Sequence, residues 1–300
     1  MISVLLPVFN VEDYIERTLL SLQNQTYSDF EVLIIDDCST DGTRDKVLRF
    51  IDSDSRFKLY YNDENKGISY SLNKVLTKAT GDYIARIDGD DIASPQRLAT
   101  QLNYLLDFEL DLVGCSIRTI DENDKVISLP AIFPSKKKHI DSLIKFCSPV
   151  VHIWLCKKKV YEITGNYRFD GAEDLDFILR AYELGCKISN CPDRLMDIRI
   201  RNGNTNSTIG LKQRLLHKYI FKIKDERNLN NLEASIFEYE NVSFFRKKTY
   251  ELSSRILRLS KKNKFIFIRL VLSFISVLIS IDQFDYMIYR LKRKLILRFL

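Results

Sequence analysis

The segment "YIARIDGDDIASPQR", residues 83–97, combines an apolar run with three closely spaced carboxylates. The run from Tyr83 to Ile87 has the length and composition of a buried β-strand, and Asp88, Asp90 and Asp91 follow at its end. Like charges this close repel and raise one another's pKa values unless a cation lies between them. The segment therefore predicts a strand whose end presents carboxylates to a positively charged ligand.

The chain before this segment alternates short apolar runs with stretches of helical periodicity. Such alternation is typical of an α/β fold with a Rossmann-like, mostly parallel sheet and helices on both faces. The strands are predicted at 2–6, 30–37, 57–62 and 82–88, and the helices at 11–22, 41–51 and 67–79. The ligand of such a sheet lies beyond the carboxyl ends of the strands. Two of these ends are acidic, at 36–37 and 88–91, and we expect them to lie on neighbouring strands.

A divalent cation bound to a diphosphate is the simplest ligand for two acidic strand ends. Mg²⁺ and Mn²⁺ prefer oxygen ligands and are commonly held by carboxylates together with substrate phosphates. The sequence has neither G-x-G-x-x-G after its first strand nor G-x-x-x-x-G-K-[ST], which excludes the dinucleotide and P-loop classes. We therefore expect a metal ion to meet the phosphates.

The last third of the chain differs from the rest in charge. A helix at 96–108, a strand at 111–120 and a helix at 173–184 continue the α/β pattern, and the polar stretch at 202–208 indicates a linker. Residues 1–200 carry 25 basic and 32 acidic side chains, whereas residues 201–300 carry 21 and 8. We predict an α/β domain at 1–208 and a helical, basic region at 209–300.

Five motifs occur in an order and spacing that resemble one known family. They are SVLLPVFN with Glu12 (3–12), LIIDDCSTDGT (33–43), NKG (65–67), ARIDGDDI with Pro95 and Arg97 (85–97), and GAEDLDFILR (171–180). Together they resemble the family-2 glycosyltransferases of the bacterial surface-polysaccharide type, over about residues 1–208. The resemblance implies the GT-A fold and an inverting transfer from a nucleotide-diphosphate sugar, usually a UDP-sugar, with Mn²⁺ or Mg²⁺. The acceptor would be a glycan or a lipid-linked sugar.

The resemblance also assigns residues to the nucleotide. Pro7, Phe9 and Glu12 would line the nucleotide pocket. Asp37 would accept a hydrogen bond from the N3–H of uracil, and Lys66 would lie near the base or the phosphates. These five residues follow the first three predicted strands or end them, where a ligand of a parallel sheet is expected.

The same resemblance assigns metal binding and catalysis to three further carboxylates. Asp88 and Asp90 would form the D-x-D element, with Asp90 as the direct metal ligand and Asp88 nearer the ribose and the metal. Asp174, the second residue of the Glu-Asp pair, would be the catalytic base. Inversion requires the acceptor hydroxyl to attack opposite the departing diphosphate, and a carboxylate on that face must take its proton.

Three departures from the family pattern are visible. Relatives often carry His-Pro where this chain has His152 followed by Ile153, and a Tyr-Arg-x-His element appears here as residues 198–201 with Arg201 in the last position. If that His holds metal or diphosphate in relatives, Arg201 must act by charge or not at all. The Q-x-x-R-W element of processive synthases is absent near 213–219, which favours transfer of a single sugar.

Several of these residues also have ordinary structural explanations. Asp36 and Asp37 are suited to capping the following helix, and Lys66 to a solvated surface position. Glu173 and Asp174 are the acids that a helix N-terminus favours. His152 and Trp154 are typical of a buried core.

Two other function classes remain open at this stage. The segment "IDGDDI" also satisfies the D-x-D-x-aliphatic nucleophile pattern of haloacid-dehalogenase-like phosphatases, although that fold places its nucleophile on an early strand. A catalytically silent nucleotide-sugar-binding protein would keep the same motifs without turnover.

The C-terminal region has the pattern of a membrane-surface segment. Residues 265–281 are almost wholly apolar apart from Arg269, Ser273, Ser276 and Ser280, which form one narrow stripe on a helix. At 1.5 Å per residue this run measures about 25 Å, less than the roughly 30 Å hydrocarbon core. Residues 286–300 form a basic amphipathic helix, which favours the membrane interface. A helix packed on protein is the alternative, and the density of apolar residues argues against nucleic acid.

The N-terminal residues and the cysteines, taken with the basic C-terminal region, suggest a location. MISVLLPVFN has no charged n-region and no small-residue cleavage site. The six cysteines are scattered without C-x-x-C spacing, as expected for reduced thiols. We expect a cytoplasmic protein, peripheral to the inner face of the cell membrane.

Overall fold

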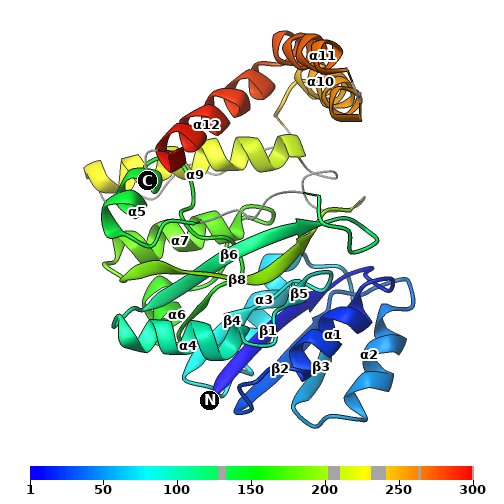
Figure 1. Ribbon diagram of the computed structural model, residues 1–300, viewed down its shortest axis with the longest axis vertical. Coiled ribbons are helices and arrows are strands. Elements are labelled where there is room, and N and C mark those ends of the chain that lie inside the picture. Colours follow the sequence, from blue (N-terminus) through cyan, green and yellow to red (C-terminus); the bar gives the residue numbers. More distant parts are fainter. Residues whose placement is uncertain (128–132, 202–209, 231–240, 263–264, 299–300) are drawn as a thin grey trace. The chain divides into compact units, whose positions relative to one another are not determined.

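The structure is a computed structural model that describes residues 1–127, 133–201, 210–230, 241–262 and 265–298. Its first unit, residues 1–204, is built around an eight-stranded sheet (Figure 1). The strands follow the order β3-β2-β1-β4-β7-β6-β8-β5 across the sheet. Their bounds are β1 (Ile2–Val8), β2 (Phe30–Asp36), β3 (Phe57–Tyr61), β4 (Tyr83–Arg86), β5 (Ile92–Ala93), β6 (Leu112–Ile120), β7 (Leu155–Lys157) and β8 (Ile188–Arg199).

The sheet is parallel in its first half and mixed in its second. β1 pairs in parallel with both β2 and β4, and β2 pairs in parallel with β3. β7 is antiparallel to β4 and β6, β6 is parallel to β8, and β5 is antiparallel to β8. The predicted Rossmann-like arrangement is therefore confirmed for the strands that precede the acidic segment.

The two acidic strand ends are not neighbours, because β1 lies between β2 and β4. The prediction that they share adjacent strands is wrong. Apolar periodicity identifies a strand but says nothing about its place in the sheet. The chain runs from β1 outward to β3 and then returns to the other side of β1, which creates a topological switch point between β1 and β4. Ligands of α/β sheets lie at such points.

Helices cover both faces of the sheet. The helices of the first unit are α1 (Ile15–Gln23), α2 (Thr43–Ile51), α3 (Ile68–Leu76), α4 (Arg97–Asp107), α5 (Lys137–Leu143), α6 (Lys159–Thr164) and α7 (Glu173–Glu183). Val4 and Leu6 of β1 pack in one apolar cluster with residues of α1 and α4. α3 also contacts β1 and β2. Because alternate residues of a strand point to opposite faces, Leu5, which lies between Val4 and Leu6, belongs to the face that α3 covers.

Every strand and helix predicted within the first unit is present, with ends that shift by a few residues. α1 begins at Ile15 rather than at 11, because Val11 to Tyr14 form a turn in which the Tyr14 N–H donates to the Val11 carbonyl at 2.9 Å. β5, β7, β8, α5 and α6 were not predicted. β5 and β7 have two and three residues, and β8 contains Pro192 and several charged residues, which weaken a strand pattern.

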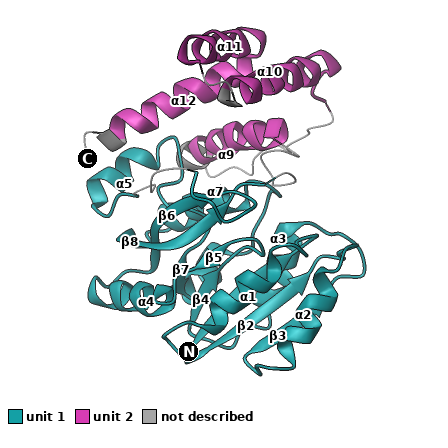
Figure 2. Cartoon of the chain, turned by 45° about the vertical axis from the view of Figure 1, so that its right-hand side comes forward, with its two compact units in different colours: residues 1–204 teal, residues 205–300 magenta. Residues whose placement is uncertain are grey.

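The second unit, residues 205–300, is helical where the structure describes it (Figure 2). It contains α9 (Gly210–Asn230), α10 (Phe244–Lys262), α11 (Ile266–Ile279) and α12 (Ile281–Arg298). The buried carboxylate of Asp282 at the start of α12 accepts hydrogen bonds from Arg246 of α10 at 2.7 and 2.9 Å, and Lys218 of α9 lies 3.4 Å away. The predicted linker at 202–208 lies outside the described residues, and the domain division at 208 stays a prediction.

α10 and α11 pack against each other through serines. The Ser253 hydroxyl donates to the Ser276 carbonyl at 2.7 Å, and the Ser260 hydroxyl donates to the Arg269 carbonyl at 2.8 Å. The polar stripe of α11 thus faces α10, whereas apolar side chains on its other side, among them Phe267, are exposed. None of the described helices combines the length and the apolar character needed to cross a bilayer.

Candidate active site

The acidic segment 88–91 begins where β4 ends, at the switch point of the sheet. Thr18 of α1 fixes its backbone, because its hydroxyl lies 3.0 Å from the Gly89 carbonyl and 2.8 Å from the Asp91 carbonyl. Gly89 is needed here, since a Cβ at this position would lie 2.8 Å from Cγ1 of Val8. The close approach to β1 therefore places the three carboxylates beside the end of the neighbouring strand.

The carboxylate of Asp88 already has cations of the chain beside it. Nε of Arg86 lies 3.2 Å from its Oδ1, and Nε2 of His152 lies 3.3 Å from its Oδ2. Burial alone would raise the pKa of Asp88, but Arg86 and His152 outweigh burial and hold that pKa below its usual range. The cation predicted from the crowded carboxylates is therefore supplied in part by the protein itself.

Arg86 connects this segment to α7. The Arg86 side chain is almost wholly buried, and its Nη2 donates to Oε1 of Glu173 at 2.9 Å. Burial raises the pKa of Glu173, with Arg86 opposing this rise and Asp174 adding to it. Asp174, which lies in the first turn of α7, is thus electrostatically linked to both Glu173 and Arg86. A single buried guanidinium therefore joins Asp88 of the acidic segment to Glu173 in the first turn of α7.

Asp88, Asp91 and His152 form a group that can hold a metal ion. One ligand atom from each lies within 4.8 Å of the others. Oδ2 of Asp91 is buried and has no hydrogen-bond partner among the described residues, and Nε2 of His152 lies 3.7 Å from it. Burial raises the pKa of Asp91 to about 7. Burial would lower the pKa of His152, but the two carboxylates raise it to about 9.

Asp90 is held by the end of β8. Nε of Arg201 donates to Oδ2 of Asp90 at 2.6 Å, and Nε of Arg199 donates to the Asp90 carbonyl at 2.8 Å. The Arg199 N–H donates to Oδ1 of Asp91 at 2.9 Å. Burial raises the pKa of Asp90, although Arg201 opposes the rise. Arg199 at the end of β8 and Arg201 just beyond it therefore fix the acidic segment.

Asp37 follows β2 and organises the turn that contains the NKG motif. Its Oδ1 accepts from the Asn62 side-chain amide at 2.7 Å and from the Lys66 N–H at 2.9 Å, and its Oδ2 accepts from the Gly67 N–H at 2.9 Å. Asp36 instead accepts from the Ser39 N–H and pairs with Arg44. Neither acid caps α2, because that helix begins at Thr43 after Gly42. The structural explanation by capping is therefore wrong.

Gly67 brings the NKG turn against the loop before α7. Its φ of +86° lies in the left-handed region, and a Cβ there would lie 2.4 Å from Oδ2 of Asp170. The same carboxylate accepts from the Ser69 N–H at 2.8 Å. The Lys66 side chain pairs with Glu64 and is exposed. The turn and α7 therefore meet through backbone and Asp170, while the Lys66 ammonium lies at the surface.

The three residues assigned to the nucleotide pocket follow one another near the end of β1. Pro7 is buried within β1, Phe9 just beyond it is exposed, and Glu12 is partly exposed. Oε2 of Glu12 accepts from the Gly42 N–H at 2.6 Å, which joins the loops after β1 and β2. The Asn10 side-chain carbonyl also accepts from the Thr40 N–H at 2.9 Å. These loops form one connected rim beside Asp37.

Sequence reasoning missed several residues of this site. Arg86 was not singled out, and Asp91, although named among the crowded carboxylates, was given no role as a ligand. Arg199 was noted only as part of residues 198–201, and His152 was assigned to the core although it faces Asp88 and Asp91. Buried arginines carry no local signal, because only the fold reveals which carboxylates they face. Trp154 is buried and stacks on Phe177 with 5.5 Å between ring centroids, so its assignment to the core is confirmed.

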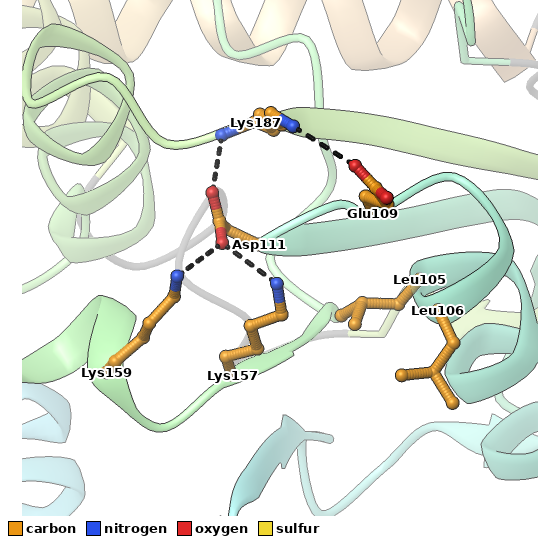
Figure 3. Close-up of a pocket in the computed structure, with 7 residues that line it drawn as sticks. All are labelled: Leu105, Leu106, Glu109, Asp111, Lys157, Lys159 and Lys187. Atoms are coloured by element: carbon orange, nitrogen blue, oxygen red, sulfur yellow. Dashed lines mark hydrogen bonds and ion pairs between the residues drawn. The ribbon is translucent and has the colours of Figure 1, made fainter.

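A pocket of about 440 Å³ lies at the ends of the strands opposite to those that bear the acidic segment. Figure 3 shows the residues that line it. It is formed where β6 and β8 begin and β7 ends, whereas the acidic segment follows the end of β4. Lys157 and Lys159 converge on Asp111 at 3.1 and 3.0 Å, and Lys187 lies 3.7 Å from Glu109. The lysines of this pocket are thus paired with carboxylates, and the pocket is separate from the candidate active site.

Comparison with known proteins identifies the family. The family model described as "Glycosyl transferase family 2" matches residues 3–163. The chain belongs to glycosyltransferase family 2. The match begins in β1 and includes the acidic segment and His152, so the site described above lies largely within it.

Several individual relatives are bacterial glycosyltransferases. The O-antigen biosynthesis glycosyltransferase WbnJ of Escherichia coli is 33% identical over 215 residues, which are 69% of this chain and 83% of WbnJ. WfgD of E. coli, a UDP-Glc:α-D-GlcNAc-diphosphoundecaprenol β-1,3-glucosyltransferase, is 35% identical over 49% of this chain and 56% of its own length. The chain spans 62% and 53% of the length of two further curated glycosyltransferases that it matches.

Solved structures confirm the fold. S. aureus TarS in complex with UDP-GlcNAc superposes with a TM-score of 0.60 at 20% identity, covering 93% of this chain and 81% of the TarS chain. The Pyrobaculum calidifontis mannosyltransferase PcManGT, in complex with GDP-Man and Mn²⁺, gives a TM-score of 0.59 at 18% identity, covering 97% and 84%. The predicted α/β GT-A fold with a C-terminal helical region is thus confirmed. The family assignment disfavours the phosphatase alternative.

Proposed function

We propose that this protein is an inverting glycosyltransferase that moves one sugar from a UDP-sugar to a glycan or lipid-linked acceptor in surface polysaccharide biosynthesis. The observation that carries the proposal is the buried Arg86, which joins Asp88 at the end of β4 to Glu173 at the start of α7. The reaction needs a diphosphate-binding element and a base within one site, and Arg86 provides that link. WbnJ and WfgD support the pathway and the kind of acceptor.

The donor nucleotide would lie over the rim formed by the loops after β1 and β2. Asp37 would accept a hydrogen bond from the N3–H of uracil. Its Oδ2 accepts from the Gly67 N–H, and the second lone pair of this oxygen would serve that purpose. Pro7, Phe9 and Glu12 would line the pocket, with the exposed Phe9 ring available for contact with the base. Lys66 would turn from Glu64 toward the phosphates.

The donor set fits a hard divalent cation. Oδ2 of Asp91 is buried and has no hydrogen-bond partner in the part of the chain that the structure describes. Together with Asp88 and His152 it offers oxygen and nitrogen ligands that Mn²⁺ accepts. In our proposal Asp88 and Asp90 hold Mn²⁺ or Mg²⁺, and Asp91 and His152 lie beside the ion as further possible ligands. When bound, the ion would stabilise the negative charge that develops on the leaving diphosphate.

Asp174 would take the proton of the acceptor hydroxyl. It lies in the first turn of α7, where the N-terminus of a helix carries partial positive charge. Glu173 beside it is occupied by Arg86 and by the Gly171 N–H at 3.0 Å. Asp174 is therefore better suited than Glu173 to face a substrate.

Substitution of the proposed base tests the assignment. We expect Asp174→Asn to lower turnover by at least about a hundredfold, the usual contribution of a general base, while UDP binding in the presence of Mn²⁺ is unchanged in calorimetry. Asp193→Asn, at an exposed position, is the matched control. Full activity in Asp174→Asn would contradict the role of this residue. Absence of turnover by the wild type with every donor would support the binding protein instead.

We further propose that the second unit attaches the enzyme to an anionic membrane surface on the cytoplasmic side. α11 exposes Phe267, Phe274 and Leu278, because its serines are turned toward α10. Exposed basic residues of α12, including Arg290 and Lys294, complement anionic head groups. Apolar and basic groups of this kind together are typical of interfacial helices. A lipid-linked acceptor would be found at the same surface.

Vesicle sedimentation tests this attachment. We expect the full chain to bind vesicles containing anionic lipid more tightly than neutral ones. Phe267→Gln with Phe274→Gln should weaken binding to both, whereas Arg290→Gln with Lys294→Gln should weaken binding to anionic vesicles only. Unchanged sedimentation of the first pair would contradict the proposal, and a change of oligomeric state instead would indicate a protein partner.

A further inference from the structure

The side chain of Arg201 pairs with a carboxylate that the proposed function assigns to a metal ion. Its Nε lies 2.6 Å from Oδ2 of Asp90, and both side chains are mostly buried. Asp90 is the residue assigned above as the direct metal ligand. A divalent cation bound to this same oxygen would lie close to the guanidinium, and like charges a few ångströms apart repel strongly in a partly buried site.

Asp90 does not depend on Arg201 for its position. Arg199 holds the Asp90 carbonyl at 2.8 Å and holds Asp91 through its own N–H at 2.9 Å. Arg199 also donates to the Asp121 carbonyl at 2.7 Å, which fixes its own side chain. We therefore expect the acidic segment to keep its place when the Arg201 guanidinium is removed.

Arg201 also has a surface on which it can turn. Its guanidinium carbon lies 5.4 Å from the centroid of the Tyr14 ring, a distance typical of a cation–π contact. The Arg199 guanidinium lies 4.8 Å from the same ring. Contact with an aromatic face does not fix the direction of the N–H groups, so Arg201 can change its hydrogen-bond partner and still cover Tyr14.

We propose that Arg201 exchanges partners when the donor binds: it leaves Asp90 to the incoming metal ion and pairs with the diphosphate of the nucleotide. This inference rests on the proposed function, because it needs a nucleotide diphosphate and a divalent cation at this site. A planar guanidinium is well suited to both partners, since carboxylates and phosphates accept the same forked N–H pair.

The exchange makes metal and nucleotide bind together. Metal alone has to displace Arg201 from Asp90, and the displaced guanidinium then lies near the metal ion without its carboxylate partner, which is unfavourable. Nucleotide diphosphate alone gains Arg201 but leaves Asp90 facing the phosphates without a cation. Only the two ligands together give both Asp90 and Arg201 a partner of opposite charge. Each should therefore raise the affinity of the protein for the other by the same factor.

Binding of Mn²⁺ and UDP to the full chain tests the exchange without any turnover assay. Mn²⁺ affinity is measured by electron paramagnetic resonance with and without UDP, and UDP affinity by calorimetry with and without Mn²⁺. For wild type we expect weak Mn²⁺ binding alone and at least about tenfold tighter binding with UDP, which corresponds to about 1.4 kcal/mol of coupling.

Arg201→Gln should change the two affinities in opposite directions. Mn²⁺ alone should bind about tenfold more tightly, because Asp90 is then free, and UDP in the presence of Mn²⁺ should bind about tenfold more weakly, because the diphosphate loses its guanidinium. Arg201→Lys should retain part of the UDP affinity. Arg56→Gln breaks a comparable ion pair, with Asp54 before β3, and should change neither affinity.

The outcomes separate the exchange from the function on which it rests. Loss of both affinities in Arg201→Gln, or unchanged Mn²⁺ binding, with native fluorescence of Trp154, would overturn the exchange and leave the proposed function intact. Wild type that binds UDP equally with and without Mn²⁺ would also overturn it. Wild type that binds no UDP under any condition would remove the proposed function and the exchange together.

Discussion

Glu31 near the start of β2 offers a test of what holds the first unit together. Its Oε1 accepts from the Ser3 hydroxyl at 2.7 Å and from the N–H and hydroxyl of Thr80 at 2.9 and 2.7 Å, while Oε2 pairs with Lys58 at 2.9 Å. One buried carboxylate thus ties β1, β2 and β3 to the turn before β4. We predict that Glu31→Gln destabilises the first unit at neutral pH.

The magnitude follows from the pKa of this carboxyl group. Burial alone would raise the pKa, but the hydrogen bonds from Lys58, Thr80 and Ser3 outweigh it and lower the pKa from 4.5 to about 2. At about 1.4 kcal/mol for each pKa unit, this difference corresponds to about 3 kcal/mol of stability. Because the folded pKa is depressed, the contribution is present above about pH 4.5 and is lost as the pH falls toward about 2.

Urea unfolding followed by the fluorescence of Trp154 measures this effect. Trp154 is the single tryptophan of the chain and is buried in the first unit, so its signal reports on that unit. Glutamine keeps the shape and the Oε1 acceptor, so the variant removes mainly the charge. We expect Glu31→Gln to lose about 3 kcal/mol at pH 7, and about half of that difference near pH 3.3.

A matched control and a clear contrary result complete the test. Glu16→Gln removes an exposed carboxylate that lies 3.4 Å from Lys46, and it should change stability by less than about 0.5 kcal/mol. A loss below about 1 kcal/mol for Glu31→Gln at pH 7 would refute the reasoning. The same conclusion would follow from a difference that stays constant between pH 5 and pH 3.

Three further predictions concern the buried charges. Arg86→Met should cost the first unit about 3–5 kcal/mol in the same urea assay, because it leaves Asp88 and Glu173 buried without their shared cation; a cost under about 1 kcal/mol would show that the link between β4 and α7 is not needed for folding. In metal-free protein, NMR titration should place the pKa of His152 near 9 and the pKa of His139, which burial and neighbouring lysines lower, below 6.5. Because the folded pKa of His152 is raised, its contribution to the stability of the first unit is complete below about pH 6.5 and is lost as the pH rises through about 9. A His152 that titrates below 6.5 would contradict its pairing with Asp88 and Asp91. Asp282→Leu should make the helical circular dichroism signal of the chain fall at a lower temperature on heating, because Arg246 and Lys218 of the second unit lose their common partner. An unchanged melting curve would show that these ion pairs contribute little to stability.

The sequence by itself determined the local elements and the chemistry of their ends. Each strand of the parallel half is a short apolar run, and "IDGDD" after the fourth of them already required a cation. Such signals are local, because the periodicity of apolar residues depends only on which side of one element is buried. For the same reason the family motifs could be recognised one by one, before any of them had a position in space.

Only the tertiary structure decided which elements and charges meet. β1 separates the two acidic strand ends, Arg86 reaches Glu173 across 87 positions of sequence, and Arg201 reaches Asp90 across 111. Contacts this distant depend on the order of strands and on how helices cover the sheet, which no local pattern specifies. A buried arginine reveals its role only when the fold shows the carboxylate in front of it, because its energy comes from that partner and from the exclusion of water around both.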